Sequence, residues 1–228
     1  MGLLTKLFND ASDADFKLAQ DLVAIAIADG EISEAERKVI SEICQKEGVS
    51  KETVNDYLHG YDEEVISKMP AKHLEKINYL ANLIRVMGVD GQSTHMEIYL
   101  LEIIASKLGI GHMELVSLVL MTATHNNFPG NIGSKTLASF LHNVIDPKGK
   151  KLDDNRDNLK KLFDIMAENV PQLQSEEEDK AAFVKAMNAA TELLMENSLL
   201  NSEFRSIGID FETVLVDERE QAIRRWIR

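Results

Sequence analysis

Two stretches of the chain place oxygen-bearing side chains at regular spacing around an Asp-Gly pair. The first is "ADGEISEAE" at 28–36 and the second is "VDGQSTHME" at 89–97. In a calcium-binding EF-hand loop, ligands occupy positions 1, 3, 5, 7, 9 and 12, with glycine at position 6. If Asp29 is placed at position 5, the later ligand positions fall on Glu31, Ser33 and Glu36. The spacing therefore indicates oxygen-ligand chemistry of the kind that suits calcium or magnesium.

The first half of such a loop is missing in both stretches. Positions 1 and 3 would be Ile25 and Ile27 in the first copy, and Val86 and Gly88 in the second. None of these side chains offers an oxygen, and all of them belong to an apolar segment that we expect to form a buried helix. A complete EF-hand is excluded in both places.

The glutamates have a structural alternative. Ser33 with Glu36, and Thr94 with Glu97, have the spacing of a capping box, in which each side chain accepts a backbone hydrogen bond at a helix start. Such a cap contributes about 1 kcal/mol to helix stability. The glycine after each aspartate suits the left-handed conformation that often ends a helix.

The aspartates are harder to explain, because a negative charge at a helix C-terminus costs roughly 0.3–1 kcal/mol. An Asx-turn, in which the carboxylate accepts an amide hydrogen of the turn, is one compensation. The other compensation is a divalent cation, calcium or magnesium. Its ligands would be Asp29, Glu36 and either Glu31 or a carbonyl oxygen of the turn. Both alternatives stay open, and the candidate metal ligands are Asp29, Glu31, Glu36, Asp90 and Glu97.

The two stretches belong to a longer internal repeat with an offset of 61 residues. The offset superimposes Leu22 on Leu83, Asp29 on Asp90, Glu36 on Glu97, Ile40 on Leu101 and Gly48 on Gly109. The matches are in register and at chemically distinctive positions. We therefore predict two units that pack together, each made of a helix, an Asp-Gly turn and a second helix.

Apolar residues at helical spacing, with scarce strand signals, predict an all-α multi-helix bundle. Beyond the repeat, we expect helices at 135–145, 154–169 and 176–198, and in the final stretch "DEREQAIRRWIR". The Asn-, Gly- and Pro-rich stretch "THNNFPGNIGSK" predicts an exposed connection. We therefore expect a repeat domain at 1–125 and a C-terminal helical domain or extension at 126–228.

The chain is acidic, with a formal net charge of −13. Such a charge repels nucleic acid and favours cations or basic partners, so we expect no nucleic-acid partner. Cys44 is the only cysteine, which excludes a disulfide framework and favours a cytoplasmic location. The start "MGLLTKLF" does not have the pattern of a signal peptide or a membrane span, and docking onto the protein's own core is favoured over docking onto a membrane.

The segments "LVAIAIADGEISEAERKVISEI" and "LIRVMGVDGQSTHMEIYLLEII" resemble the tellurite-resistance TerB family, over about residues 14–123. The mark of that family is an apolar helix that runs into Asp-Gly, with an acidic residue seven positions after the aspartate. The resemblance implies an all-helical, pseudo-symmetric domain with metal-binding acidic patches, centred here on Asp29, Glu36, Asp90 and Glu97. It also implies a role in stress-linked assemblies near the membrane. In the second turn, Gln92 and Ser93 replace the Glu31 and Ile32 of the first.

No catalytic constellation is present in the sequence. It lacks a His-Glu-x-x-His pair, a Walker loop, a dinucleotide fingerprint and a nucleophile elbow. Cys44 lies on an apolar helix face, where a thiol is inert. Arg224, Arg225 and Arg228 around Trp226 could bind an anionic partner, although arginines also suit a helix C-terminus.

We therefore predict a non-catalytic, cytoplasmic, TerB-like acidic interaction module that binds a protein partner and serves a stress-response assembly. Peripheral membrane association would come through that complex, and nothing in the pattern excludes a homo-oligomer. The alternative function is divalent-metal binding or sensing by the Asp-Gly turns.

Overall fold

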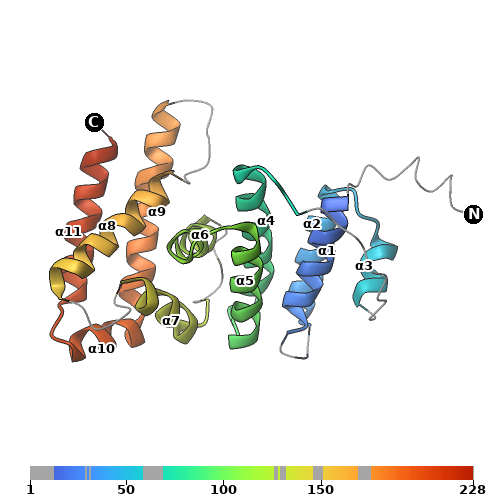
Figure 1. The fold of residues 1–228 in the computed structure, drawn as a ribbon, viewed down its shortest axis with the longest axis horizontal. Helices are drawn as coiled ribbons and strands as arrows, with labels where there is room; N and C mark the ends of the chain where they lie inside the picture. The colour runs from blue at the N-terminus through green and yellow to red at the C-terminus, as the bar shows by residue number, and fades with distance from the viewer. Residues whose placement is uncertain are drawn as a thin grey trace, which may run out of the picture. The chain divides into compact units, whose positions relative to one another are not determined.

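A computed structural model describes residues 13–28, 30, 32–58, 69–125, 128, 132–145, 151–168 and 176–227. All regular elements within these residues are α-helices, which confirms the predicted all-α fold. The chain order is α1 (Asp13–Ala26), α2 (Glu34–Lys46), α3 (Lys51–Leu58), α4 (His73–Gly88), α5 (His95–Leu108), α6 (His112–His125), α7 (Ser134–Ile145), α8 (Leu152–Glu168), α9 (Glu176–Glu196), α10 (Ser198–Ser206) and α11 (Phe211–Trp226) (Figure 1).

The helices form two compact units, the first ending at Gly109 and the second beginning at Ile110. This division differs from the predicted boundary after residue 125, because α6 belongs to the second unit. Helix α6 packs against α7, α8 and α9. Its apolar run is buried on several sides, and a single partner helix could not cover it; the run includes Leu115, Val116, Leu118, Val119 and Leu120.

In the first unit, α1 and α4 provide the core. Helix α1 contacts α2, α3, α4 and α5, while α4 contacts α1, α2 and α5 (Figure 1). Leu22 and Ile25 of α1 and Leu80 and Leu83 of α4 are fully buried. Lys76 also ties α4 to α5, because its ammonium group donates to the carbonyl oxygen of Leu108 at 2.7 Å.

A buried polar group crosses the apolar contact between α1 and α4. Asp21 is buried, forms an ion pair with Lys17 on the same helix, and accepts a hydrogen bond from the hydroxyl of Tyr79. Burial, together with the charge of Asp21 and the hydrogen bond to it, raises the pKa of Tyr79. The phenol therefore stays protonated and donates to the carboxylate, which links the two helices at a single register.

The first unit also tests the local helix predictions. The stretch "KETVNDYL" forms α3 as expected, whereas most of the short helix expected at "EEVISKM" lies outside the described residues. Helix pairs α1–α2 and α4–α5 begin and end at positions that differ by 60 to 62 residues. This correspondence is compatible with the repeat at offset 61, which stays a prediction.

The second unit contains a helix break that the sequence pattern did not predict. The helix expected at 176–198 ends at Glu196, and a separate helix α10 begins at Ser198. Buried Asn197 separates them, because its side-chain oxygen accepts from the Leu200 N–H at 2.9 Å. Its amide donates to the carbonyl oxygen of Ser134 at 3.1 Å, which links this break to the start of α7.

Helix α11 starts six residues before the stretch in which a helix was predicted. Asp210 provides its N-cap, with a side-chain oxygen that accepts from the Thr213 N–H. The first residue of the helix, Phe211, stacks on Phe204 of α10 with ring centroids 4.6 Å apart. Among the described residues, no helix is both long and apolar enough to cross a membrane.

We expect Tyr79→Phe to destabilise the protein by about 1–3 kcal/mol, because it removes a donor from a buried carboxylate. Tyr99→Phe is the matched control, since Tyr99 is exposed, and it should change stability by less than about 0.5 kcal/mol. Urea unfolding followed by circular dichroism measures both. Equal midpoints for the two variants would show that the hydrogen bond to Asp21 adds no stability.

Candidate functional site at the two Asp-Gly turns

The turns that carry the predicted ligands join α1 to α2 and α4 to α5. The two glycines have left-handed backbones, with φ of 99° at Gly30 and 79° at Gly91. In the first turn, the Gly30 N–H donates to the carbonyl oxygen of Ile27 at 2.9 Å; in the second, the Gly91 N–H donates to that of Gly88 at 3.1 Å. Asp29 and Glu31, two of the predicted ligands, lie outside the described residues.

Glu36 and Glu97 are buried, and each closes a capping box. The carboxylate of Glu36 accepts from the Ser33 N–H at 2.7 Å, and the Ser33 hydroxyl oxygen accepts from the Glu36 N–H at 3.2 Å. The corresponding distances for Glu97 and Thr94 are 2.5 and 3.3 Å. The two glutamates therefore satisfy backbone donors at the starts of α2 and α5.

Asp90 is exposed and forms the Asx-turn that was one of the two predicted compensations. Its Oδ1 atom accepts from the Gln92 N–H at 2.8 Å. This hydrogen bond offsets part of the cost of a negative charge next to the end of α4. In the second turn, a local interaction is therefore sufficient to explain the aspartate.

Of the predicted ligands that the structure describes, Glu36 and Glu97 close capping boxes and Asp90 forms an Asx-turn. Across the residues described, no group of three or more His, Cys, Asp or Glu side chains could hold a metal ion. Ile25 and Val86, at the first EF-hand position, are fully buried, as expected. Ile27, at the third position, is 48% exposed, although it was expected to belong to a buried helix.

The helix that follows the first turn does not present a purely acidic face. Its exposed charged side chains include two acids, Glu34 and Glu42, and three bases, Arg37, Lys38 and Lys46. Glu36, which the family resemblance placed in an acidic patch, is buried. The acidity of the first unit therefore arises mainly outside α2.

Helix α5 carries a second apolar face that the sequence analysis did not identify. Its inner face is buried in the first unit, with Leu101 and Ile104 among its residues. On the opposite side, Met96 is 53% exposed and Tyr99 is 58% exposed, and Leu100 and Ile103 are half-buried. We call these four residues the outer face of α5. Their spacing of i, i+3, i+4 and i+7 could have been found in "HMEIYLLEIIASKL", which is apolar on nearly all sides.

Cys44 is buried on α2, as predicted. Burial, together with the charge of Glu47, raises the pKa of its thiol to about 12. Since the thiolate is the reactive form, Cys44 is not a nucleophile near neutral pH.

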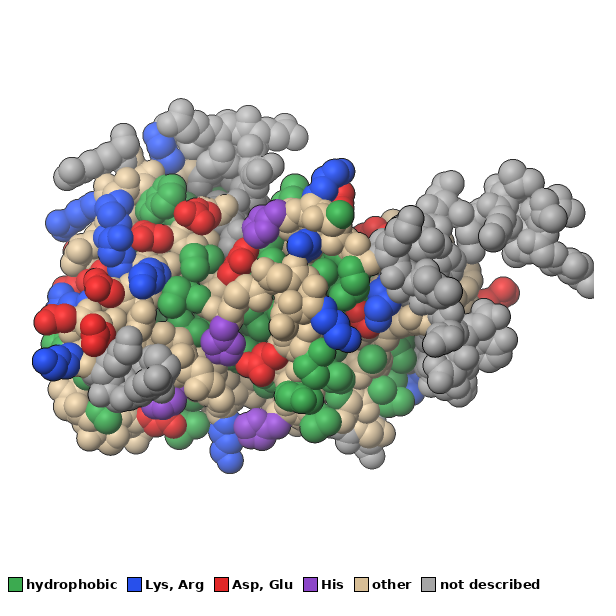
Figure 2. Space-filling model, in the orientation of Figure 1, with side chains coloured by type: hydrophobic (Ala, Val, Ile, Leu, Met, Phe, Trp, Pro, Cys, Tyr) green, Lys and Arg blue, Asp and Glu red, His purple; other side chains and the backbone are tan. Residues whose placement is uncertain are grey.

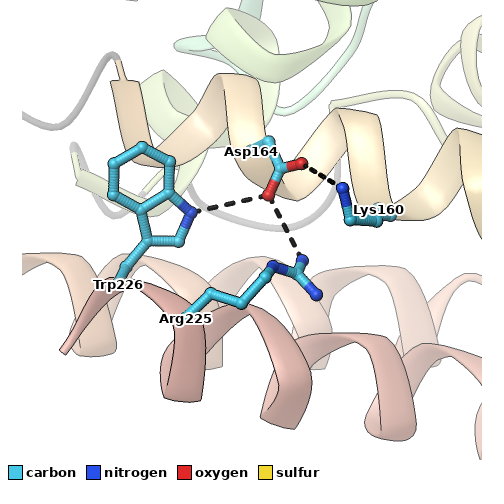
Figure 3. A network of polar contacts seen from close by, with 4 residues as sticks. All are labelled: Lys160, Asp164, Arg225 and Trp226. Carbon is cyan, nitrogen blue, oxygen red and sulfur yellow. Dashed lines mark hydrogen bonds and ion pairs between the residues drawn. The ribbon is translucent and has the colours of Figure 1, made fainter. Parts of the chain in front are cut away.

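The basic end of α11 binds an acidic side chain of its own unit. Asp164 of α8 accepts from Arg225 at 3.2 Å and from the indole N–H of Trp226 at 3.5 Å (Figure 3). Its other oxygen accepts from Lys160 at 3.2 Å. Arg224 pairs with Glu220 at 3.4 Å, while Arg228 lies outside the described residues. These contacts favour the helix-end role of the arginines, and no sequence signal could have identified Asp164 as their partner.

The same α8–α11 contact contains the buried carboxyl group of Glu218. Burial raises its pKa, although the charges of Arg156 and Arg225 act in the opposite direction. Because the pKa in the folded state lies above the ordinary value, Glu218 contributes less to stability as the pH rises through that raised value.

No family model matches the chain, and neither a curated protein nor a solved structure is significantly similar to it.

We expect Asp90→Asn to leave the protein at least as stable, because asparagine keeps the acceptor of the Asx-turn and removes the charge at the helix end. Asp90→Ala should cost about 0.5–1 kcal/mol, because it removes the acceptor. Chemical unfolding of chelator-treated protein, with and without millimolar calcium or magnesium, measures both. A metal-induced stabilisation that Asp90→Asn abolishes would instead assign the carboxylate to a cation.

We expect Asp164→Ala to shift the fluorescence emission of Trp226, the only tryptophan, to longer wavelengths and to increase its quenching by acrylamide. The indole loses its hydrogen-bond acceptor, and Arg225 loses its partner. Because these groups are partly exposed, stability should fall by no more than about 1 kcal/mol. Asp217→Ala, which removes an acid paired with Arg156, is the control and should leave the emission unchanged. Unchanged emission in Asp164→Ala would contradict the contact.

Proposed function

We propose that the chain is a TerB-like, non-catalytic interaction module that binds a protein partner within a cytoplasmic stress-response assembly. Two hairpins support this proposal, each made of a helix, an Asp-Gly turn and a second helix. In both hairpins the second helix starts with the same kind of capping box. Both also have a left-handed glycine after the aspartate.

The observation that carries the proposal is the exposure of large apolar side chains on an acidic unit. In the first unit, Ile27, Leu74, Met96 and Tyr99 are all about half exposed. Hydrophobic side chains gather on the face of this unit that is turned to the viewer in Figure 2. Exposed apolar patches rimmed by polar groups commonly mark sites of protein association. We also propose that the chain associates peripherally with a membrane through the complex that it forms with its partner.

Divalent-metal binding is the second candidate. It is favoured by the exposure of Asp90, whose carboxylate is accessible to a hydrated cation at the turn. Because Glu36 and Glu97 are buried in capping boxes, the ligands of such a site would have to be centred on Asp90 and on Asp29 with Glu31. Oxygen ligands of this number suit calcium or magnesium bound with several waters.

Affinity capture from an extract of the source cells, read by quantitative mass spectrometry, tests the interaction module. We expect the unaltered chain to enrich a small, reproducible set of proteins, and Glu34→Lys to lose at least half of that enrichment. Glu212→Lys is the matched control, because Glu34 and Glu212 are both exposed glutamates in the first turn of a helix. The change in helix-dipole energy is therefore similar in the two variants.

The absence of any protein enriched over the background by the unaltered chain would contradict the interaction module. Equal enrichment by Glu34→Lys and Glu212→Lys would exclude the surface next to the first turn as part of the binding site. An enrichment that is lost with chelator and restored by calcium or magnesium would favour the metal function.

A further inference from the structure

We propose that the outer face of α5 is the docking surface for a basic amphipathic helix of the partner protein. This inference rests on the proposed interaction module and adds the place of binding and the chemistry of the partner. Met96, Tyr99, Leu100 and Ile103 are the residues that define the face.

The first step is the spacing of these residues. Positions i, i+3, i+4 and i+7 form one stripe along a helix, over a length of about 10 Å. The stripe lies opposite to the buried side of α5, which includes Ile98, Leu101 and Leu108. Helix α5 is therefore apolar on two sides. Among the described helices, α1 and α4 pack against it, and Met96 and Tyr99 are still more than half exposed.

The second step is the type of occupant. An apolar stripe with this spacing matches the side chains of a second helix, which anchors itself through residues at i, i+3 or i+4, and i+7. Tyrosine and methionine suit such a surface. Tyrosine gives a large contact area at low entropic cost, and methionine adapts to different partners.

The third step is the charge of the occupant. Residues 1–109 carry 11 basic and 19 acidic side chains, so the first unit attracts a basic partner and repels an acidic one. A second copy of the chain brings a net charge of −13, and anionic lipid is also negative. Electrostatics therefore favours a basic helix over a second copy or a membrane.

The charges along α5 also predict how the partner is oriented. Exposed Asp90 lies in the turn before the stripe, and exposed Lys107 lies beyond its other end. The basic side chains of the partner should therefore be concentrated at the end that lies nearest to Asp90. The opposite polarity would place like charges together at Lys107.

Fluorescence anisotropy with three labelled peptides of about 18 residues tests the proposal on the full chain. The first peptide has leucines at i, i+3, i+4 and i+7, lysines at the remaining positions of one half and serines and glutamines at those of the other half, which gives an amphipathic helix with one basic end. The second replaces the lysines by glutamates, and the third keeps the composition of the first but shuffles the leucines out of helical spacing. We expect only the first peptide to bind tightly, and its affinity to fall as salt rises from about 50 to about 300 mM.

Variants of the chain locate the binding. Met96→Gln with Tyr99→Gln should weaken binding of the first peptide at least tenfold and leave the thermal unfolding midpoint unchanged, since both side chains are exposed. Ile207→Gln is the control, because Ile207 is exposed to a similar degree in the second unit, and it should bind as the unaltered chain does. Tyr99→Phe keeps the apolar ring and should also retain binding.

Several outcomes would overturn the proposal. Two concern the peptides, namely equal affinity for the basic and acidic peptides and equal affinity for the ordered and shuffled peptides. A third is that the double variant binds the first peptide as tightly as the unaltered chain does. A fourth is that the unaltered chain forms a dimer that the double variant converts to a monomer. Binding to vesicles of phosphatidylcholine and phosphatidylglycerol that the double variant abolishes would also overturn it, in favour of a membrane.

The outcome of this test is separable from that of the proposed function. If the double variant still enriches the same proteins from the extract, the interaction module stands and the docking surface on α5 is wrong. If the unaltered chain enriches nothing, the interaction module itself fails, whatever the peptides do.

Discussion

Helices α1 and α4 carry apolar side chains on more than one face, and each must therefore be covered from more than one side. The other helices of the first unit are arranged to meet this requirement, and the Asp-Gly turns fold them back against α1 and α4. The same requirement assigns α6 to the second unit, where three helices cover it. The need for apolar side chains at the ends of α1 and α4 also explains why no oxygen ligand stands at the first EF-hand position before either turn. Buried isoleucine and valine occupy that position.

At two places, a buried polar side chain that enters the apolar contacts has specific partners. Asp21 meets Lys17 and Tyr79, and Asn197 meets backbone groups on two sides. Such groups add little net stability, but they make alternative registers costly, because a shifted helix would leave a buried polar atom without a partner. The register of α1 against α4 and the position of the α9–α10 break therefore depend on a few specific hydrogen bonds.

Local patterns were sufficient to predict much of this fold. Helical spacing identified the second helix of each turn, and Ser33 with Glu36 predicted a capping box that is present. Contacts between distant residues could not be predicted in this way. Nothing near Asp164 indicates that Arg225 and Trp226, more than 60 residues later, will bind it. The division after Gly109 could not be predicted for a similar reason, because composition marks an exposed loop but not the helices that cover α6.

Gly30 shows that a turn can be selective without being crowded. Its backbone is left-handed, yet a Cβ atom added there in L-geometry would meet nothing within 4 Å. What disfavours alanine at this position is therefore the handedness of the residue itself and not its neighbours. The φ of Gly30 is one that a residue of the opposite hand favours, and a D-amino acid also restricts the unfolded chain more than glycine does. The turn between α1 and α2 is thus selective for the handedness of the backbone, although it leaves open space around an L-type Cβ atom.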